Sequence, residues 1–124
     1  MTAALGFNPR EVAASNLIFV RSRDAESMPF LRYAELCWPI HVEILKIVQP
    51  RMVLVYGNSP GSPYSFLSKK FGVRTEKWYN SGHAAWKCRM FRVPGSFRVV
   101  GLPHLSRYDV TAHRDVVRWI KNLA

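Results

Sequence analysis

A histidine, a serine and an arginine follow an apolar segment near the end of the chain, within Phe97-Arg98-Val99-Val100-Gly101-Leu102-Pro103-His104-Leu105-Ser106-Arg107-Tyr108. The apolar residues predict a buried strand over 97–102, and the polar residues predict a loop at its carboxyl end. Ligands of open α/β sheets bind where loops leave the carboxyl ends of the strands. The sequence therefore predicts a site for a polar or anionic ligand around His104, Ser106 and Arg107. A loop histidine bonded only to backbone is the plainer interpretation of His104.

A tight loop follows a second apolar segment, 52–56, with the sequence Gly57-Asn58-Ser59-Pro60-Gly61-Ser62-Pro63. Its first five residues match the G-x-S-x-G pattern that carries the nucleophile of α/β-hydrolases. That mechanism needs the backbone N–H of the residue after the serine, and Pro60 has none. The loop also lacks the Gly-Lys-Ser/Thr ending of a phosphate-binding P-loop. We therefore expect a turn whose remaining N–H groups face a ligand or water.

A sheet with covering helices must position these loops, and the hydrophobic pattern predicts one. Near-continuous apolar runs are typical of buried parallel strands, and Pro39 is expected to start or kink the main helix. The order of elements predicts a single α/β domain over residues 1–124, with a three-layer, mainly parallel sheet. The expected elements are strands at 16–21, 52–56 and 97–102, helices at 28–48, from after Pro63 to about 71 and from about 111 to 123, and irregular strands or a hairpin at 73–95.

The charge of the chain is strongly positive, with 18 Lys and Arg against 8 Asp and Glu among 124 residues and a net charge of +10. Basic charge supplies the sequence-independent part of affinity for nucleic acids, which falls as salt rises. The composition therefore favours a polyanionic partner, DNA above all. A basic protein with no role at nucleic acids remains the alternative interpretation.

The two cysteines, Cys37 and Cys88, are too few to complete a four-ligand zinc or iron–sulfur site by themselves. We expect buried thiols, no metal and no cofactor. The first residues lack the features of a signal peptide, and no apolar run is long enough to cross a membrane. The sequence therefore predicts a cytoplasmic protein without a membrane partner.

Three segments, in this order, resemble motifs of the uracil-DNA glycosylase superfamily, most closely its microbial branch whose members often carry an iron–sulfur cluster. Leu5-Gly6-Phe7-Asn8-Pro9-Arg10-Glu11-Val12-Ala13-Ala14-Ser15-Asn16-Leu17 is similar to the family's segment leading into its second strand. Residues 37–57, from Cys37-Trp38-Pro39 to Gly57, are similar to its block of cysteine, proline, helix and apolar strand. Residues 99–108 resemble its His-Pro-Ser motif, with Leu105 where proline is usual.

The resemblance implies roles for particular residues. Asn16 would read the Watson–Crick edge of an extruded base, since an amide both donates and accepts hydrogen bonds. His104 would stabilise negative charge on the leaving base. Ser106, Arg107 and Tyr108 would lie at the DNA backbone, and Gly57 and Ser59 are further candidates for DNA contact.

The chain departs from the family at its start. The family's first strand and the motif after it, which supplies the water-activating residue and a base-stacking aromatic, have no counterpart here, and Gly6-Phe7-Asn8-Pro9 comes too early in the chain. We expect a truncated or degenerate domain, or a longer natural chain, that binds DNA or a nucleobase without full base-excision activity. The alternative is a non-catalytic interaction protein that retains the fold and self-associates. Without the missing strand, 16–21 and 52–56 should pair directly or be covered in a homodimer.

Overall fold

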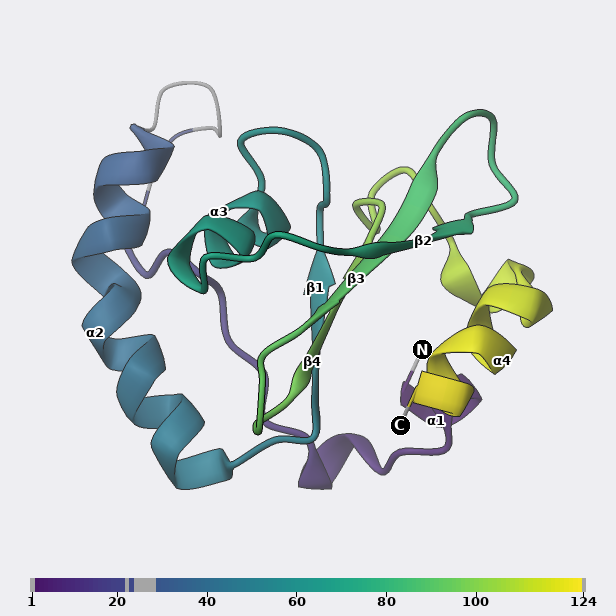
Figure 1. Ribbon diagram of the computed structural model, residues 1–124, viewed down its shortest axis with the longest axis horizontal. Coiled ribbons are helices and arrows are strands. Elements are labelled where there is room, and N and C mark those ends of the chain that lie inside the picture. The colour runs from purple at the N-terminus through teal and green to yellow at the C-terminus, as the bar shows by residue number, and fades with distance from the viewer. Residues whose placement is uncertain (1, 22, 24–28, 124) are drawn as a thin grey trace. The chain divides into compact units, whose positions relative to one another are not determined.

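The structure is a computed structural model that describes residues 2–21, 23 and 29–123. It comprises two compact units (Figure 1). We call residues 1–12 and 51–124 the sheet unit, and residues 13–50 the helix unit. No helix among the described residues is long and apolar enough to cross a membrane.

A four-stranded sheet forms the centre of the sheet unit, with the strand order β1-β4-β3-β2. β1 (Met52–Tyr56) and β4 (Arg98–Leu102) form at the two apolar runs that predict strands, and they pair in parallel. β2 (Lys77–Asn80) and β3 (Lys87–Arg92) form the hairpin, and both the β2–β3 and the β3–β4 pairs are antiparallel. The expectation of a mainly parallel sheet was therefore wrong, because a hairpin adds its strands antiparallel to each other.

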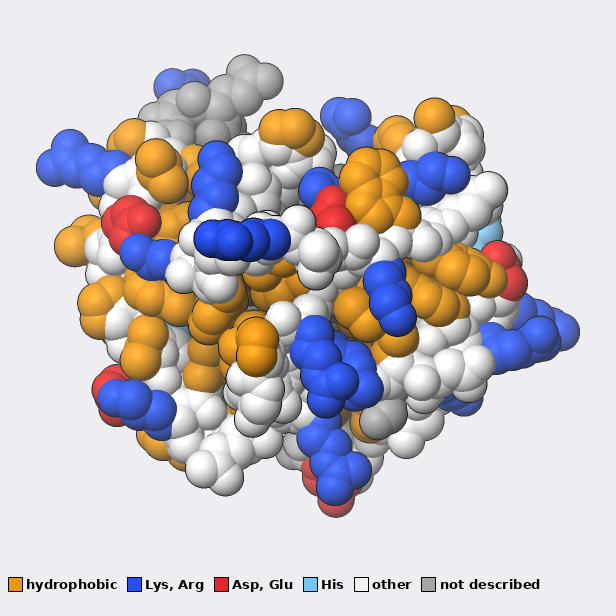
Figure 2. Space-filling model, viewed as in Figure 1, with side chains coloured by type: hydrophobic (Ala, Val, Ile, Leu, Met, Phe, Trp, Pro, Cys, Tyr) orange, Lys and Arg blue, Asp and Glu red, His pale blue; other side chains and the backbone are white. Residues whose placement is uncertain are grey.

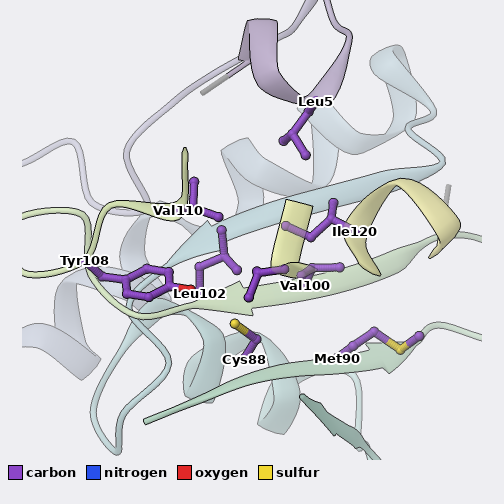
Figure 3. Close-up of a cluster of buried hydrophobic side chains, with 9 residues drawn as sticks. Leu5, Cys88, Met90, Val100, Leu102, Tyr108, Val110 and Ile120 are labelled. Atoms are coloured by element: carbon purple, nitrogen blue, oxygen red, sulfur yellow. The ribbon is translucent and has the colours of Figure 1, made fainter. Parts of the chain in front are cut away.

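Side chains of β3 and β4 alternate between two helix-covered faces. One face packs against α4 (Arg114–Leu123) and the short α1 (Thr2–Leu5), and Figure 3 shows Val100 beside Ile120 on this face. The core cluster on this face comprises Leu5, Cys88, Met90, Val100, Leu102, Tyr108, Val110, Val116 and Ile120.

The opposite face packs against α3 (Pro63–Lys70), whose Tyr64 and Phe66 are buried. Gly101 of β4 lies directly under the Tyr64 ring, which a Cβ at this position would overlap. Ser62 caps α3 by accepting from the backbone N–H of Ser65, and Pro63 occupies the first turn, where its missing N–H costs nothing. Ser62 and Pro63 thus determine where the loop after β1 ends and α3 begins.

The last helix begins later than expected. Asp109 caps a short 3-10 turn, Val110–Ala112, through the backbone N–H and hydroxyl of Thr111, and α4 starts at Arg114. A similar 3-10 turn, Pro9–Glu11, follows Asn8 near the start of the chain. Both caps are local Asx turns, which compete with helix formation.

In the helix unit, α2 (Phe30–Val48) begins well before Pro39, which therefore does not start it. Residues 16–21 do not form the expected strand. The backbone of this segment is instead hydrogen-bonded to side chains of α2. The Phe19 N–H donates to Cys37 Sγ at 3.5 Å, and the Leu17 carbonyl lies 2.8 Å from His41 Nε2. Direct pairing of 16–21 with 52–56, one of the two expected arrangements, was therefore wrong, and the homodimer stays a prediction.

Candidate functional site

Three loops meet at one edge of the sheet. β1 and β4 run in parallel, with Tyr56 opposite Leu102, so the loops 57–62 and 103–109 leave side by side. β3 runs the other way, with Arg89 opposite Gly101, and this brings the turn 81–86 to the same edge. The edge at the carboxyl ends of two parallel strands is where α/β sheets bind ligands.

His104 is exposed at this edge and its ring is held by Ser106. The backbone N–H of Ser106 donates to His104 Nδ1 at 3.2 Å, and the Ser106 hydroxyl lies 2.8 Å from the same nitrogen. A backbone N–H can only donate, so Nδ1 is the acceptor and the proton of the neutral imidazole is on Nε2. His104 therefore offers an oriented Nε2–H donor to a ligand.

Gly57 lies beside His104, and a Cβ at Gly57 would be 3.8 Å from His104 Cδ2. Its φ of 98° lies in the region that favours glycine. Its N–H donates to the Leu102 carbonyl at 2.8 Å, and its carbonyl accepts from the Tyr64 N–H at 3.3 Å. Gly57 thus joins the two strand ends and has no N–H left for a ligand, whereas Ser59 is exposed further along the loop.

Asn58 ties the loop 57–62 to the sheet. Its side-chain amide donates to the carbonyls of Lys87 at 2.7 Å and Gly101 at 2.9 Å, and its own carbonyl accepts from Arg89 Nη1 at 2.9 Å. A loop bonded to two strands through one residue is preorganised, so a ligand pays less ordering entropy on binding it.

Arg89 is fixed in turn by Glu76. Its Nε and Nη2 both donate to Glu76 Oε1, at 3.0 and 2.7 Å, and Tyr64 donates its hydroxyl to Glu76 Oε2 at 2.9 Å. Burial, followed by the bond to Glu76, raises the pKa of Tyr64, so its hydroxyl stays a donor. Both carboxylate oxygens of Glu76 thus accept hydrogen bonds, and Glu76 positions the loop 57–62 through Arg89.

Tyr108 joins the loop 103–109 to the turn 81–86. Its hydroxyl donates to the Ser81 carbonyl at 2.6 Å, and its ring stacks on His113 at 4.9 Å between centroids. Tyr108 is only 3% exposed. Its side chain therefore holds the edge together from inside, and it is not among the surface groups that a ligand would meet.

The structure brings most of the sequence-predicted residues to one edge. His104, Ser106, Arg107 and Ser59 are exposed there, around the buried Gly57. Asn16 belongs to the helix unit, where it is exposed in an irregular segment, and its place relative to this edge is not defined.

Sequence reasoning missed Asn58, Arg89 and Glu76. The available signal was Arg89, a charged residue between Cys88 and Met90 in a strand that packs on both faces, because a partly buried charge needs a partner. Among the described residues, no group of three His, Cys, Asp or Glu side chains could hold a metal ion.

The positive charge is unevenly divided. The sheet unit has fourteen Lys and Arg against four Asp and Glu, which accounts for the whole net charge of +10, whereas the helix unit has four of each. Figure 2 shows far more Lys and Arg side chains than Asp and Glu side chains on the face turned to the viewer. The unit that carries the candidate site is therefore the one that attracts anions.

Comparisons of the chain with protein-family models, with curated proteins and with solved structures give no match.

Proposed function

We propose that this protein binds nucleic acid at the carboxyl edge of β1 and β4, as a uracil-DNA-glycosylase-like protein without full base-excision activity. The observation that carries the proposal is the oriented Nε2–H of His104, exposed at that edge in the unit that holds all the excess positive charge. A fixed N–H donor suits a carbonyl oxygen of a base or a phosphate oxygen.

The neighbouring groups suit a polyanion as well. Arg107 can neutralise a phosphate, and the hydroxyl of Ser59 can bond to phosphate or sugar oxygens. Asn16 enters the proposal through the family resemblance alone, as the amide that reads the edge of a base. Helices on both faces of the sheet support the three-layer architecture of that family, and the two free, buried cysteines support a reducing, cytoplasmic location.

Base excision needs a group that activates water, and two carboxylates near this edge, Glu76 and Asp109, are engaged in hydrogen bonds. Glu76 is bonded to Arg89 and Tyr64. Asp109 accepts from Thr111, whose side-chain and backbone hydrogen bonds lower the pKa of Asp109 and make it a weaker base. We therefore propose binding without a complete hydrolytic site.

The experiment is fluorescence anisotropy with short labelled single- and double-stranded DNA over a range of salt concentrations. We expect weak binding that falls steeply as salt rises, because each neutralised phosphate adds about 0.9 to the slope of log affinity against log salt. Arg107→Ala should lower affinity and reduce that slope by about one. Absence of binding at low salt, or binding that ignores salt, would overturn the proposal.

Arg118→Ala is the matched control, since Arg118 is also an exposed arginine of the sheet unit but lies on α4. Both variants lose one positive charge, so any difference between them reports position rather than net charge. Equal effects would show that binding is diffuse and not centred on the edge around His104.

A second candidate function is self-association, favoured by the position of β1 at the end of the strand order. An edge strand presents unpaired N–H and C=O groups that can pair with another chain. The apolar β1 sequence Met-Val-Leu-Val-Tyr suits such pairing. Light scattering at micromolar concentration tests it, and a monomer at all concentrations would exclude it.

A further inference from the structure

The hairpin of β2 and β3 carries an exposed tryptophan with a cation fixed behind it. Trp78 of β2 lies directly opposite Arg89 of β3, so both side chains project from the same face of the sheet. The Arg89 guanidinium lies over the Trp78 ring, 5.2 Å from its centroid, yet Trp78 is 60% exposed. A large aromatic side chain this exposed is unusual, because burying it is worth several kcal/mol.

Arg89 holds Trp78 in a layered arrangement. The guanidinium also lies over the Tyr64 ring, 5.0 Å from its centroid, and its nitrogens are bonded to Glu76 and to the Asn58 carbonyl. Arg89 is thus fixed on one side and presents its planar group to Trp78 on the other. An aromatic ring held in this way loses little side-chain entropy when something stacks on it.

The surroundings of Trp78 match an anionic, aromatic ligand. Lys87 is exposed one diagonal step from Trp78 on the same face, and Asn80 lies opposite Lys87. Lys87 also lies next to the candidate site, since its backbone carbonyl accepts a hydrogen bond from the side chain of Asn58. The combination of a stacking ring and a neighbouring cation along one surface is how proteins bind single-stranded nucleic acids.

We propose that Trp78 is a stacking platform for an unpaired nucleobase, with Lys87 at the adjoining phosphate. The inference rests on the proposed function and extends it, because it names single-stranded nucleic acid as the ligand and gives the hairpin a role. From a base stacked on Trp78, the nucleic-acid strand would continue past Asn58 toward the loop 57–62.

The test separates bases from phosphates. One probe is a short labelled oligothymidylate, and the other is an oligomer of equal length made of abasic tetrahydrofuran nucleotides, which carries the phosphates without the bases. We expect the wild-type protein to bind the first more tightly. Trp78→Ala should weaken oligothymidylate binding at least about fivefold and leave the affinity for the abasic oligomer unchanged. Trp78→Phe should keep most of the preference.

Trp86→Ala is the control, since Trp86 is also an exposed tryptophan of this hairpin but contacts His83 rather than a guanidinium. It should retain the preference for oligothymidylate. Arg89→Lys keeps the charge but removes the planar group behind Trp78, so it should reduce the ratio of the affinity for oligothymidylate to the affinity for the abasic oligomer. A general loss of structure, or the loss of the Arg89 bond to Asn58, would lower both affinities together, so this ratio identifies Arg89 as a positioning residue for Trp78.

Tryptophan fluorescence gives a second readout. Oligothymidylate should quench the wild-type protein more than Trp78→Phe, and circular dichroism should show that the variants are folded. If the wild-type protein binds both oligomers and the preference survives Trp78→Ala, this inference is overturned while the proposed function stands. If it binds neither oligomer at low salt, both fail.

Discussion

Arg92 and Arg98 lie directly opposite each other across the antiparallel pair of β3 and β4. Neither forms an ion pair with the described part of the chain, and Lys77 lies one diagonal step away on the same face. Like charges at directly opposed positions destabilise a sheet. The folded sheet unit therefore tolerates a local repulsion.

Arg92→Glu should stabilise the protein, because it replaces this repulsion by an opposite-charge pair with Arg98. The expected gain is about 0.5 kcal/mol in the free energy of unfolding at low salt, and it should shrink as salt screens the pair. Urea denaturation at two salt concentrations measures it. Arg118→Glu changes the net charge equally without a facing arginine and should give a smaller gain; equal gains would mean that overall charge, not the cross-strand pair, is responsible.

Gly101→Ala should destabilise the sheet unit strongly. The new Cβ would overlap the Tyr64 ring, and Tyr64 cannot move without breaking its bond to Glu76. Overpacking of this kind costs about 1–3 kcal/mol or more. Gly95→Ala is the comparison, since Gly95 has a φ of 68° but open space at its Cβ, so it should lose only about 1 kcal/mol from backbone strain. Thermal unfolding of both variants checks the order.

The two parallel strands could be predicted from the sequence because their apolar runs are local signals, and alternation of polar and apolar residues indicated the hairpin. Residues 16–21 carry an equally apolar run, but their hydrogen bonds go to Cys37 and His41, which lie on another element. Nothing in a local pattern distinguishes a strand partner from a helix side chain. The same limit explains the wrong prediction of a mainly parallel sheet.

The candidate site, like the fold, could be predicted from the sequence only in part. The loop containing His104 follows a strand directly, so its exposure at the sheet edge could be foreseen. The link from Glu76 through Arg89 to Asn58 depends on the register that places Trp78 opposite Arg89 and on a contact between residues far apart in the sequence. Registers of this kind follow from tertiary packing, which a single sequence does not reveal.

Stability should fall at alkaline pH because of Cys88. Burial raises the pKa of the Cys88 thiol from 9.0 to about 11. Above pH 9 the unfolded chain releases the thiol proton while the folded protein retains it, so the free energy of unfolding decreases between about pH 9 and 11. The contribution is on the order of 2 kcal/mol.

Cys88→Ala isolates this contribution, since it removes the titrating group from a fully buried position. The variant should be less stable at neutral pH because it leaves a small cavity, but its stability should decline less steeply from pH 9 to 11 than that of the wild-type protein. Urea denaturation at several pH values measures both slopes. Parallel slopes would contradict the assignment to Cys88 and would leave the tyrosines, whose pKa burial also raises, as the cause.

The protein should release little or no base from uracil-containing single-stranded DNA. The oriented Nε2–H of His104 can stabilise charge on a departing base, but charge stabilisation and water activation are separate contributions to the rate. The carboxylates of Glu76 and Asp109 are engaged in hydrogen bonds and do not supply the second. The measurement is cleavage at abasic sites after incubation with the DNA, for the wild-type protein and for His104→Ala. Robust activity that disappears in His104→Ala would contradict the proposal that the hydrolytic site is incomplete.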